Sequence, residues 1–289
     1  MNAAILPHAA AGVLYAALAV YFWNSRWRDP RRSGANKGLS RWERVLLLPP
    51  ILLQAWLLHA DLIGSDMPRF GFAPALAAMT WLAVVIYWAE NFVYELDGML
   101  PPVLLVAAVA VPLPAFFPGL ASGNAASLEF KLHLVLAMLA YSLFTLAMLH
   151  AVLMAIVESR LHDSRRLAVG AGGGEFSGAL GSLPPLLTLE RLLFRLIAAA
   201  FVFLTATLAT GIAFSESLFG RALSFDHKTL FALLSWATFA VLLAGRHLQG
   251  WRGRTALRWT LAGFLFLLLA YVGSRFVLEV VLKRAILPG

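Results

Sequence analysis

The chain has 289 residues, of which 61% are hydrophobic and only 13% are charged, and its mean hydropathy is +0.79. A soluble domain of this length must expose far more polar surface than this composition provides. Enzymes built on a large water-soluble α/β scaffold, such as hydrolases and dehydrogenases, are therefore excluded. Because the chain contains no cysteine, disulfides, thiolate metal ligands, iron–sulfur clusters and covalent haem attachment through a C-x-x-C-H motif are excluded as well.

The hydrophobic runs predict an all-α polytopic membrane protein with about eight transmembrane helices. Each run is close to the roughly 20 residues that a helix needs to cross a bilayer. In chain order they cover residues 4–23, 45–63, 71–92, 99–116, 130–157, 190–214, 228–246 and 257–281. Proline pairs in the second and fourth runs, Pro49–Pro50 and Pro112 with Pro114, predict helices that begin late or are kinked there.

The net charge of +8 follows the membrane topology and does not indicate nucleic acid as a partner. Sixteen of the 23 Lys and Arg residues lie in the first, fifth and seventh connections, and such residues accumulate on the cytoplasmic side. This bias predicts that both termini lie outside. Ala17-Leu18-Ala19 resembles a signal-peptide cleavage site, but basic residues follow the first run and none precedes it, so we expect that helix to be retained.

We expect a single membrane domain over residues 1–289, with four helices in residues 1–127 and four in residues 128–289. Residues 161–189 are predicted to form a flexible cytoplasmic loop. Its glycine run at Gly170–Gly174 is typical of a linker, since the Lys-Ser/Thr ending of a phosphate-binding loop is absent.

Histidines near the outer surface are the most informative polar residues. His59 ends the second run, His133 lies about one turn inside the fifth and His227 begins the seventh. Imidazole at this depth is costly unless paired or ligated, and it is the usual axial ligand of b-type haem. His133 and His150 are about 25 Å apart along one helix, so a pair must come from different helices. The alternative is that each histidine forms a hydrogen bond to a neighbouring helix.

Other polar residues suggest local roles. Arg252 and Arg254 lie in a compact cationic turn, where arginine suits carboxylates such as haem propionates and lipid phosphates equally; an ordinary cytoplasmic anchor is the alternative. Asp226 is predicted to be the N-cap of the seventh helix. Several small polar positions in the sixth and seventh runs are predicted to be close-packing or interhelical hydrogen-bonding positions, namely Thr205, Thr207, Thr210, Gly211, Ser235 and Thr238.

The segment from Ser224 to Phe276 contains Asp226-His227-Lys228-Thr229, Ser235-Trp236, Gly250-Trp251-Arg252-Gly253 and Gly273-Ser274-Arg275. It resembles the C-terminal half of the CcsA-type cytochrome c assembly proteins, within them the YpjD branch of bacterial inner-membrane proteins. The resemblance implies non-covalent haem b near the outer membrane face, with His133 as the first external ligand and His59 as the histidine of an early helix. The tryptophan-rich stretch of that family is replaced by residues 218–225, which contain no tryptophan, and its second external histidine is missing after Arg275.

These observations lead to one main functional hypothesis and two alternatives. The main hypothesis is an inner-membrane protein, without turnover chemistry of its own, that binds or handles haem in cytochrome c assembly beside lipid and haem-receiving or assembly proteins. A scaffold or regulator that keeps the fold without haem is the alternative; a transporter would need paired intramembrane charges or broken helices in symmetric halves. The candidate iron ligands are His133, His59 and His227, and the candidate propionate partners are Arg221, Arg252 and Arg254.

Overall fold

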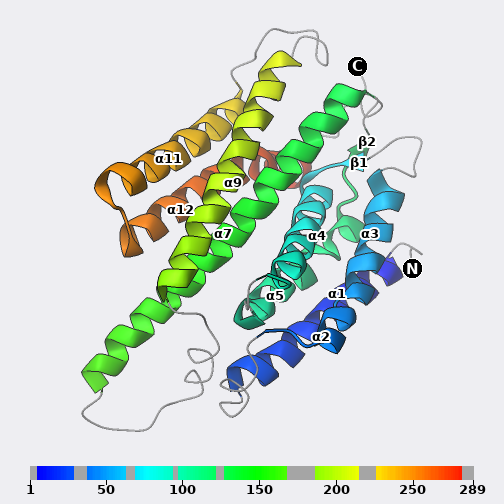
Figure 1. The fold of residues 1–289 in the computed structure, drawn as a ribbon. Coiled ribbons are helices and arrows are strands. Elements are labelled where there is room, and N and C mark those ends of the chain that lie inside the picture. Colours follow the sequence, from blue (N-terminus) through cyan, green and yellow to red (C-terminus); the bar gives the residue numbers. More distant parts are fainter. Residues whose placement is uncertain are drawn as a thin grey trace.

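The computed structural model is almost entirely helical (Figure 1). It describes residues 5–28, 38–62, 69–93, 97–121, 127–167, 186–214 and 226–281. The first half contains α1 (Ile5–Phe22) with a π-helical extension (Trp23–Arg28), α2 (Arg41–Leu46), α3 (Leu48–Leu62), α4 (Phe72–Glu90), α5 (Leu100–Ala110) and α6 (Leu113–Phe116). The second half contains α7 (Leu128–Leu167), α9 (Leu186–Ala213), α11 (His227–Gln249), α12 (Gly253–Leu268) and a terminal stretch in which α13 (Ser274–Phe276) lies between π-helical turns (Leu269–Gly273 and Val277–Val281).

All eight predicted spans coincide with helices. Within the described residues, six helices are long and apolar enough to cross a membrane, namely α1, α4, α7, α9, α11 and α12 with their extensions. The remaining two, α3 and the α5–α6 pair, are shorter because prolines interrupt them: α3 begins at Leu48, directly before Pro49, and α5 ends at Ala110, before Pro112. The predicted all-α polytopic fold is therefore confirmed.

Helices α7 and α9 form the most extensively packed helix pair in the fold, and both cross the centre of the molecule in Figure 1. At 40 residues, α7 is about 60 Å long, twice the thickness of a hydrocarbon core. The connection predicted at 161–189 is shorter than expected, because α7 continues to Leu167 and α9 already starts at Leu186. Charged residues such as Arg165 and Arg166 are good helix formers, so the helix does not end with the apolar run. Residues 168–185 lie outside the described residues.

The second half is held together by a close aromatic contact between three helices. Phe144 of α7 stacks on Phe239 of α11, with ring centroids 3.9 Å apart, and both side chains are fully buried. Gly263 of α12 also packs against the Phe239 ring, since a Cβ on Gly263 would come within 2.8 Å of the Cε2 atom of Phe239. Ser235 donates a hydrogen bond to the Gly263 carbonyl over 2.9 Å, which confirms its predicted interhelical role.

A short two-stranded ladder lies at the end of the bundle where α7 begins (Figure 1). Strand β1 (Arg69–Phe70) pairs antiparallel with β2 (Leu120–Ala121). Phe70 also contacts Phe130 in the first turn of α7, with ring centroids 5.2 Å apart. The ladder thus joins the start of α4 to the end of α6 and packs both against the second half.

Asp226 caps α11 as predicted. Its carboxylate accepts hydrogen bonds from the Thr229 backbone N–H over 2.9 Å and from the Thr229 hydroxyl over 3.0 Å. Partial burial works against ionisation, but these bonds and the charge of Lys228 outweigh it and hold the pKa of Asp226 below its usual value. The cap is therefore strongest when the carboxyl is ionised.

Replacing Asp226 by alanine is expected to cost about 0.5–2 kcal/mol of stability at pH 7, because the first turn of α11 loses its side-chain acceptor. Asp226→Asn keeps an acceptor and should cost much less. Since the folded pKa is lowered, the ionised cap contributes above the unfolded pKa near 4 and is lost as the pH falls through the folded value. Thermal unfolding in detergent at pH 7 and pH 3.5 should therefore show a smaller gap between wild type and Asp226→Ala at the lower pH; an equal gap at both would contradict this.

Candidate haem-handling site

His133 lies on α7, one turn inside the bundle, and faces the end of α9. Its Nδ1 atom is 3.0 Å from the Thr210 hydroxyl, and a Cβ on Gly211 would come within 3.3 Å of its Cε1 atom. The small residue at 211 therefore lets α9 approach the imidazole closely. Both interhelical roles predicted for Thr210 and Gly211 are confirmed.

The hydrogen bonds of Thr210 determine which nitrogen of His133 carries the proton. The Thr210 hydroxyl has one proton, and it lies 2.9 Å from the Ala206 carbonyl and 3.0 Å from the Thr207 carbonyl, which only accept. Its oxygen must then accept from His133, so Nδ1 is the protonated nitrogen. The lone pair of the neutral ring is on Nε2, in the arrangement that orients metal-binding histidines through the opposite nitrogen.

Two cationic side chains that the sequence analysis did not select lie at the same end of the bundle. The Tyr141 hydroxyl donates to the Leu267 carbonyl over 2.8 Å, which sets the level at which α7 and α12 face each other. The two helices run in opposite directions, and His133 and Arg275 each lie eight residues, about 12 Å, further toward the end that carries β1 and β2. Arg275 is therefore level with His133, and Lys228 lies close enough to Arg275 for their charges to repel.

The other two candidate ligands lie on different helices from His133 and are more exposed. His59 is exposed in the last turn of α3, which packs against α1, α4 and β1. His227 is exposed in the first turn of α11, which packs against α9 and α12. Figure 1 shows α3 and α11 on opposite sides of α7. Arg221 lies outside the described residues. Within the described part of the chain, no group of three or more His, Asp or Glu side chains is arranged to hold a metal ion.

The proposed propionate role of Arg252 and Arg254 needs correction. Arg254 donates to Glu158 over 3.0 Å, and Glu158 is 25 residues, about 38 Å, from His133 along α7. Arg252 lies in the same turn, with its Nε atom 3.9 Å from Glu190. Both arginines are therefore at the opposite end of the bundle and do not reach a haem held by His133.

His150 has a nitrogen that lacks a partner. Its side chain is 1% exposed, Nδ1 donates to the Leu146 carbonyl over 2.9 Å, and Nε2 has no hydrogen-bond partner in the described structure. The carbonyl fixes the proton on Nδ1, so a lone pair on Nε2 is buried in the inner half of α7. The lack of a partner for Nε2 depends on the packing of neighbouring helices, which the sequence does not reveal.

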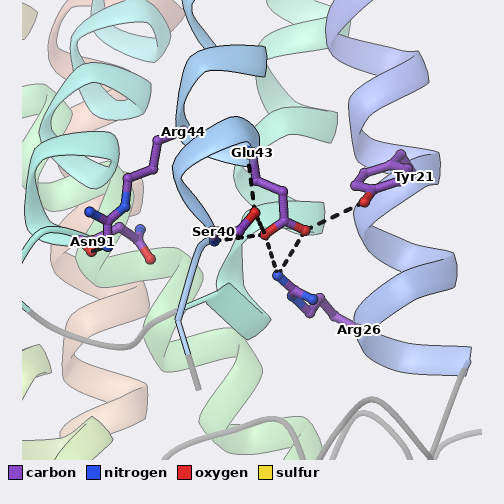
Figure 2. Close-up of polar contacts among 6 residues, drawn as sticks. All are labelled: Tyr21, Arg26, Ser40, Glu43, Arg44 and Asn91. Carbon is purple, nitrogen blue, oxygen red and sulfur yellow. Dashed lines mark hydrogen bonds and ion pairs between the residues drawn. The ribbon is translucent and has the colours of Figure 1, made fainter. Parts of the chain in front are cut away.

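A buried ion pair at the end of the bundle opposite His133 was not predicted. Arg26 donates to both carboxylate oxygens of Glu43, over 3.0 and 2.9 Å, and both side chains are almost fully buried (Figure 2). The carboxylate also accepts from the Ser40 backbone and hydroxyl, over 2.9 and 2.8 Å, and from Tyr21. Ser40 and Glu43 form a capping box at the start of α2, and the spacing Ser-x-x-Glu is the sequence signal that could have revealed it.

Comparison with known proteins supports the family that the C-terminal motifs indicate. The model of the cytochrome c assembly protein family matches residues 52–282. The chain belongs to this family. The match begins in α3 and ends beside the last π-helical turn, so it covers His59, His133, Arg275 and the whole bundle between them.

Individual relatives agree with this assignment. The inner membrane protein YpjD of Escherichia coli strain K12 is 27% identical over 82% of this chain and 84% of its own length. A protein of Azospirillum brasilense is 31% identical over 72% and 73%, and the cytochrome c biogenesis protein CcsA of Porphyra purpurea is 25% identical over 93% and 92%. No solved structure matches the chain. With its long apolar helices, the protein is a multi-pass protein of the bacterial inner membrane.

Proposed function

We propose that this protein binds haem b at the end of the bundle where α7 begins, and that it holds or passes on this haem during cytochrome c assembly without turnover chemistry of its own. The observation that carries the proposal is the orientation of His133. Its Nδ1–H is bound by Thr210, which leaves the Nε2 lone pair available for iron. The bias of basic residues toward the opposite end supports an outer-side location for this site.

The residues of this end have defined roles in the proposal. His133 would hold the haem iron through Nε2, and His59 or His227, both exposed at the ends of their helices, would provide the second imidazole. Arg275 and Lys228 replace Arg252 and Arg254 as the cations that meet the propionates. Bound haem supplies an iron that accepts two imidazole nitrogens and can change its oxidation state. Relatives that carry the name cytochrome c biogenesis protein support assembly proteins and haem-receiving proteins as partners.

The visible spectrum of the purified protein tests the proposal. Protein expressed with an adequate haem supply and purified in detergent is expected to show a Soret band that His133→Ala removes. His247→Ala is the matched control, because His247 is exposed at the end of α11 far from His133, and it should retain the band. Comparing His59→Ala with His227→Ala identifies the second ligand, since loss of that imidazole changes the spectrum without abolishing binding.

A rescue experiment separates ligation from folding. His133→Gly leaves a space for free imidazole, which should restore the Soret band if the ring binds iron. Wild-type protein that stays colourless when titrated with haem would overturn the haem proposal. That result would favour a non-haem scaffold or regulator, a function consistent with the absence of tryptophan in residues 218–225.

A further inference from the structure

A groove of about 290 Å³ opens between α2, the start of α3 and the C-terminal end of α4, on the far side of the molecule from His133. Six residues line it, two of them cationic and four apolar: Arg41, Arg44, Val45, Leu48, Trp88 and Phe92. Arg41 and Arg44 are three residues apart, so they lie on one face of α2. The groove therefore has a cationic edge and an apolar wall.

The acidic residue of α2 does not neutralise this edge. Figure 2 shows Glu43 pointing toward Arg26 and Tyr21, whereas Arg44 points away from it toward Asn91. The Glu43 carboxylate is already occupied by Arg26 and Ser40. Within the described residues, no carboxylate forms an ion pair with Arg41 or Arg44. Two positive charges thus face the groove uncompensated.

Arg44 is held in place by contacts that bring no negative charge to it. Its guanidinium lies 4.6 Å from the centre of the Phe92 ring and donates to the Asn91 carbonyl over 3.3 Å. Its Nε atom is buried and has no hydrogen-bond partner among the described residues. A guanidinium fixed in this way offers donors to an anion at little entropic cost.

The apolar wall has no polar group left to satisfy. Trp88 donates its indole N–H to the Arg44 carbonyl over 3.1 Å and packs edge-to-face against Phe92, with ring centroids 4.9 Å apart. Val45 is 61% exposed, as expected for a side chain that meets lipid. Trp88 lies in the last turn of the α4 span and Phe92 is two residues beyond it. Span ends are expected at the level of the lipid headgroups, where basic pockets between helices suit lipid phosphates.

We propose that this groove binds one anionic phospholipid, with its phosphate on Arg41 and Arg44 and the start of an acyl chain along Val45, Leu48 and Trp88. The lipid would tie α2 and α3 to the end of α4, where Trp88 and Arg44 already connect them. This site does not depend on haem binding, since it lies at the other end of the bundle and shares no residue with the proposed haem site.

Lipid retention in native mass spectrometry tests the proposal. Delipidated protein is titrated with phosphatidylglycerol, with phosphatidylcholine and with inorganic phosphate. Phosphatidylglycerol should bind with a defined stoichiometry and raise the melting temperature, and the double variant Arg41→Gln/Arg44→Gln should bind it about 30-fold more weakly, as expected for two lost arginine–phosphate contacts. Arg258→Gln removes an exposed arginine of α12 and should leave this binding unchanged.

A second variant tests the apolar part of the groove separately from the two arginines. Leu48→Trp fills the apolar wall while keeping both arginines, and it should also weaken retention of phosphatidylglycerol. Equal retention by wild type, Leu48→Trp and the double arginine variant would overturn the proposal. If phosphatidylcholine raised the melting temperature as much as phosphatidylglycerol, the charge of the lipid would be irrelevant. If inorganic phosphate did so, the groove would be an anion site without a lipid. Either result rejects an anionic phospholipid as the ligand.

Discussion

Glu43→Gln is expected to lower the free energy of unfolding by about 3–5 kcal/mol, because it removes the carboxylate charge that the buried guanidinium of Arg26 contacts. The substitution keeps the size of the side chain, so packing changes little. It replaces one of the two oxygens that accept from Arg26 by an NH2 group, which can only donate, and it weakens the capping box with Ser40. Reversible unfolding in mixed detergent micelles, followed by tryptophan fluorescence, measures the loss.

Two comparisons show whether burial is the cause. Glu158→Gln breaks the pair with Arg254, in which the side chains are 30% and 63% exposed, and should cost only about 0.2–1 kcal/mol. The double variant Arg26→Met/Glu43→Leu replaces the buried pair with apolar side chains and should recover most of the stability lost in Glu43→Gln. A cost for Glu43→Gln no larger than that for Glu158→Gln would contradict the explanation.

Phe239→Ala is expected to destabilise the protein by about 3–5 kcal/mol. Phe239 fills the space between Phe144 and Gly263, and its ring is completely buried. Gly263 has no side chain with which to fill the cavity, and the Phe144 ring loses its stacking partner. The same unfolding measurement applies.

Phe266→Ala provides the control for this cavity. Phe266 lies on the same helix as Gly263 but is only half-buried, and its ring is 6.4 Å from that of Phe231. Lipid or neighbouring side chains can occupy the space it leaves, so the loss should be less than about half of that for Phe239→Ala. Similar losses for both variants would mean that the three-helix contact contributes no special stability.

The spans were predictable because the membrane imposes a length and a composition on each one. Residues 228–246 were expected to be helical, and α11 runs from His227 to Gln249. The proline effects at Pro49 and Pro112 and the cap at Asp226 were also predictable, because they depend on neighbours within a few residues. The helical extension beyond residue 160 was not, since the end of an apolar run does not end a helix.

The candidate site was predicted only in part. His133 and its partner residue Thr210 were both selected from the sequence, but their contact depends on how α7 and α9 pack. Arg275 was seen only as the end of a motif, because its level relative to His133 follows from the contact between Tyr141 and Leu267. The error over Arg252 and Arg254 was avoidable, since the same topology that placed His133 outside placed both arginines in a cytoplasmic connection.

The buried pair of Arg26 and Glu43 shows a different limit. The sequence analysis treated Arg26 as one of many charges in a polar connection, which is the usual state of arginine. The chain folds back after α1 and places α2 against it, and this long-range contact buries both charges. Only the local capping box was visible in the sequence.

The ladder of β1 and β2 predicts which residues its relatives should share beside the two strands. Gly71 directly follows β1 and Gly119 directly precedes β2. A methyl group on Gly71 would come within 2.8 Å of the Gly119 backbone, and one on Gly119 within 2.7 Å of the Phe70 carbonyl. Gly119 also has a φ of +77°, which disfavours any other residue. Orthologues that keep the ladder should therefore carry glycine at both positions. Where one of the two glycines is replaced, we expect the other to be replaced as well.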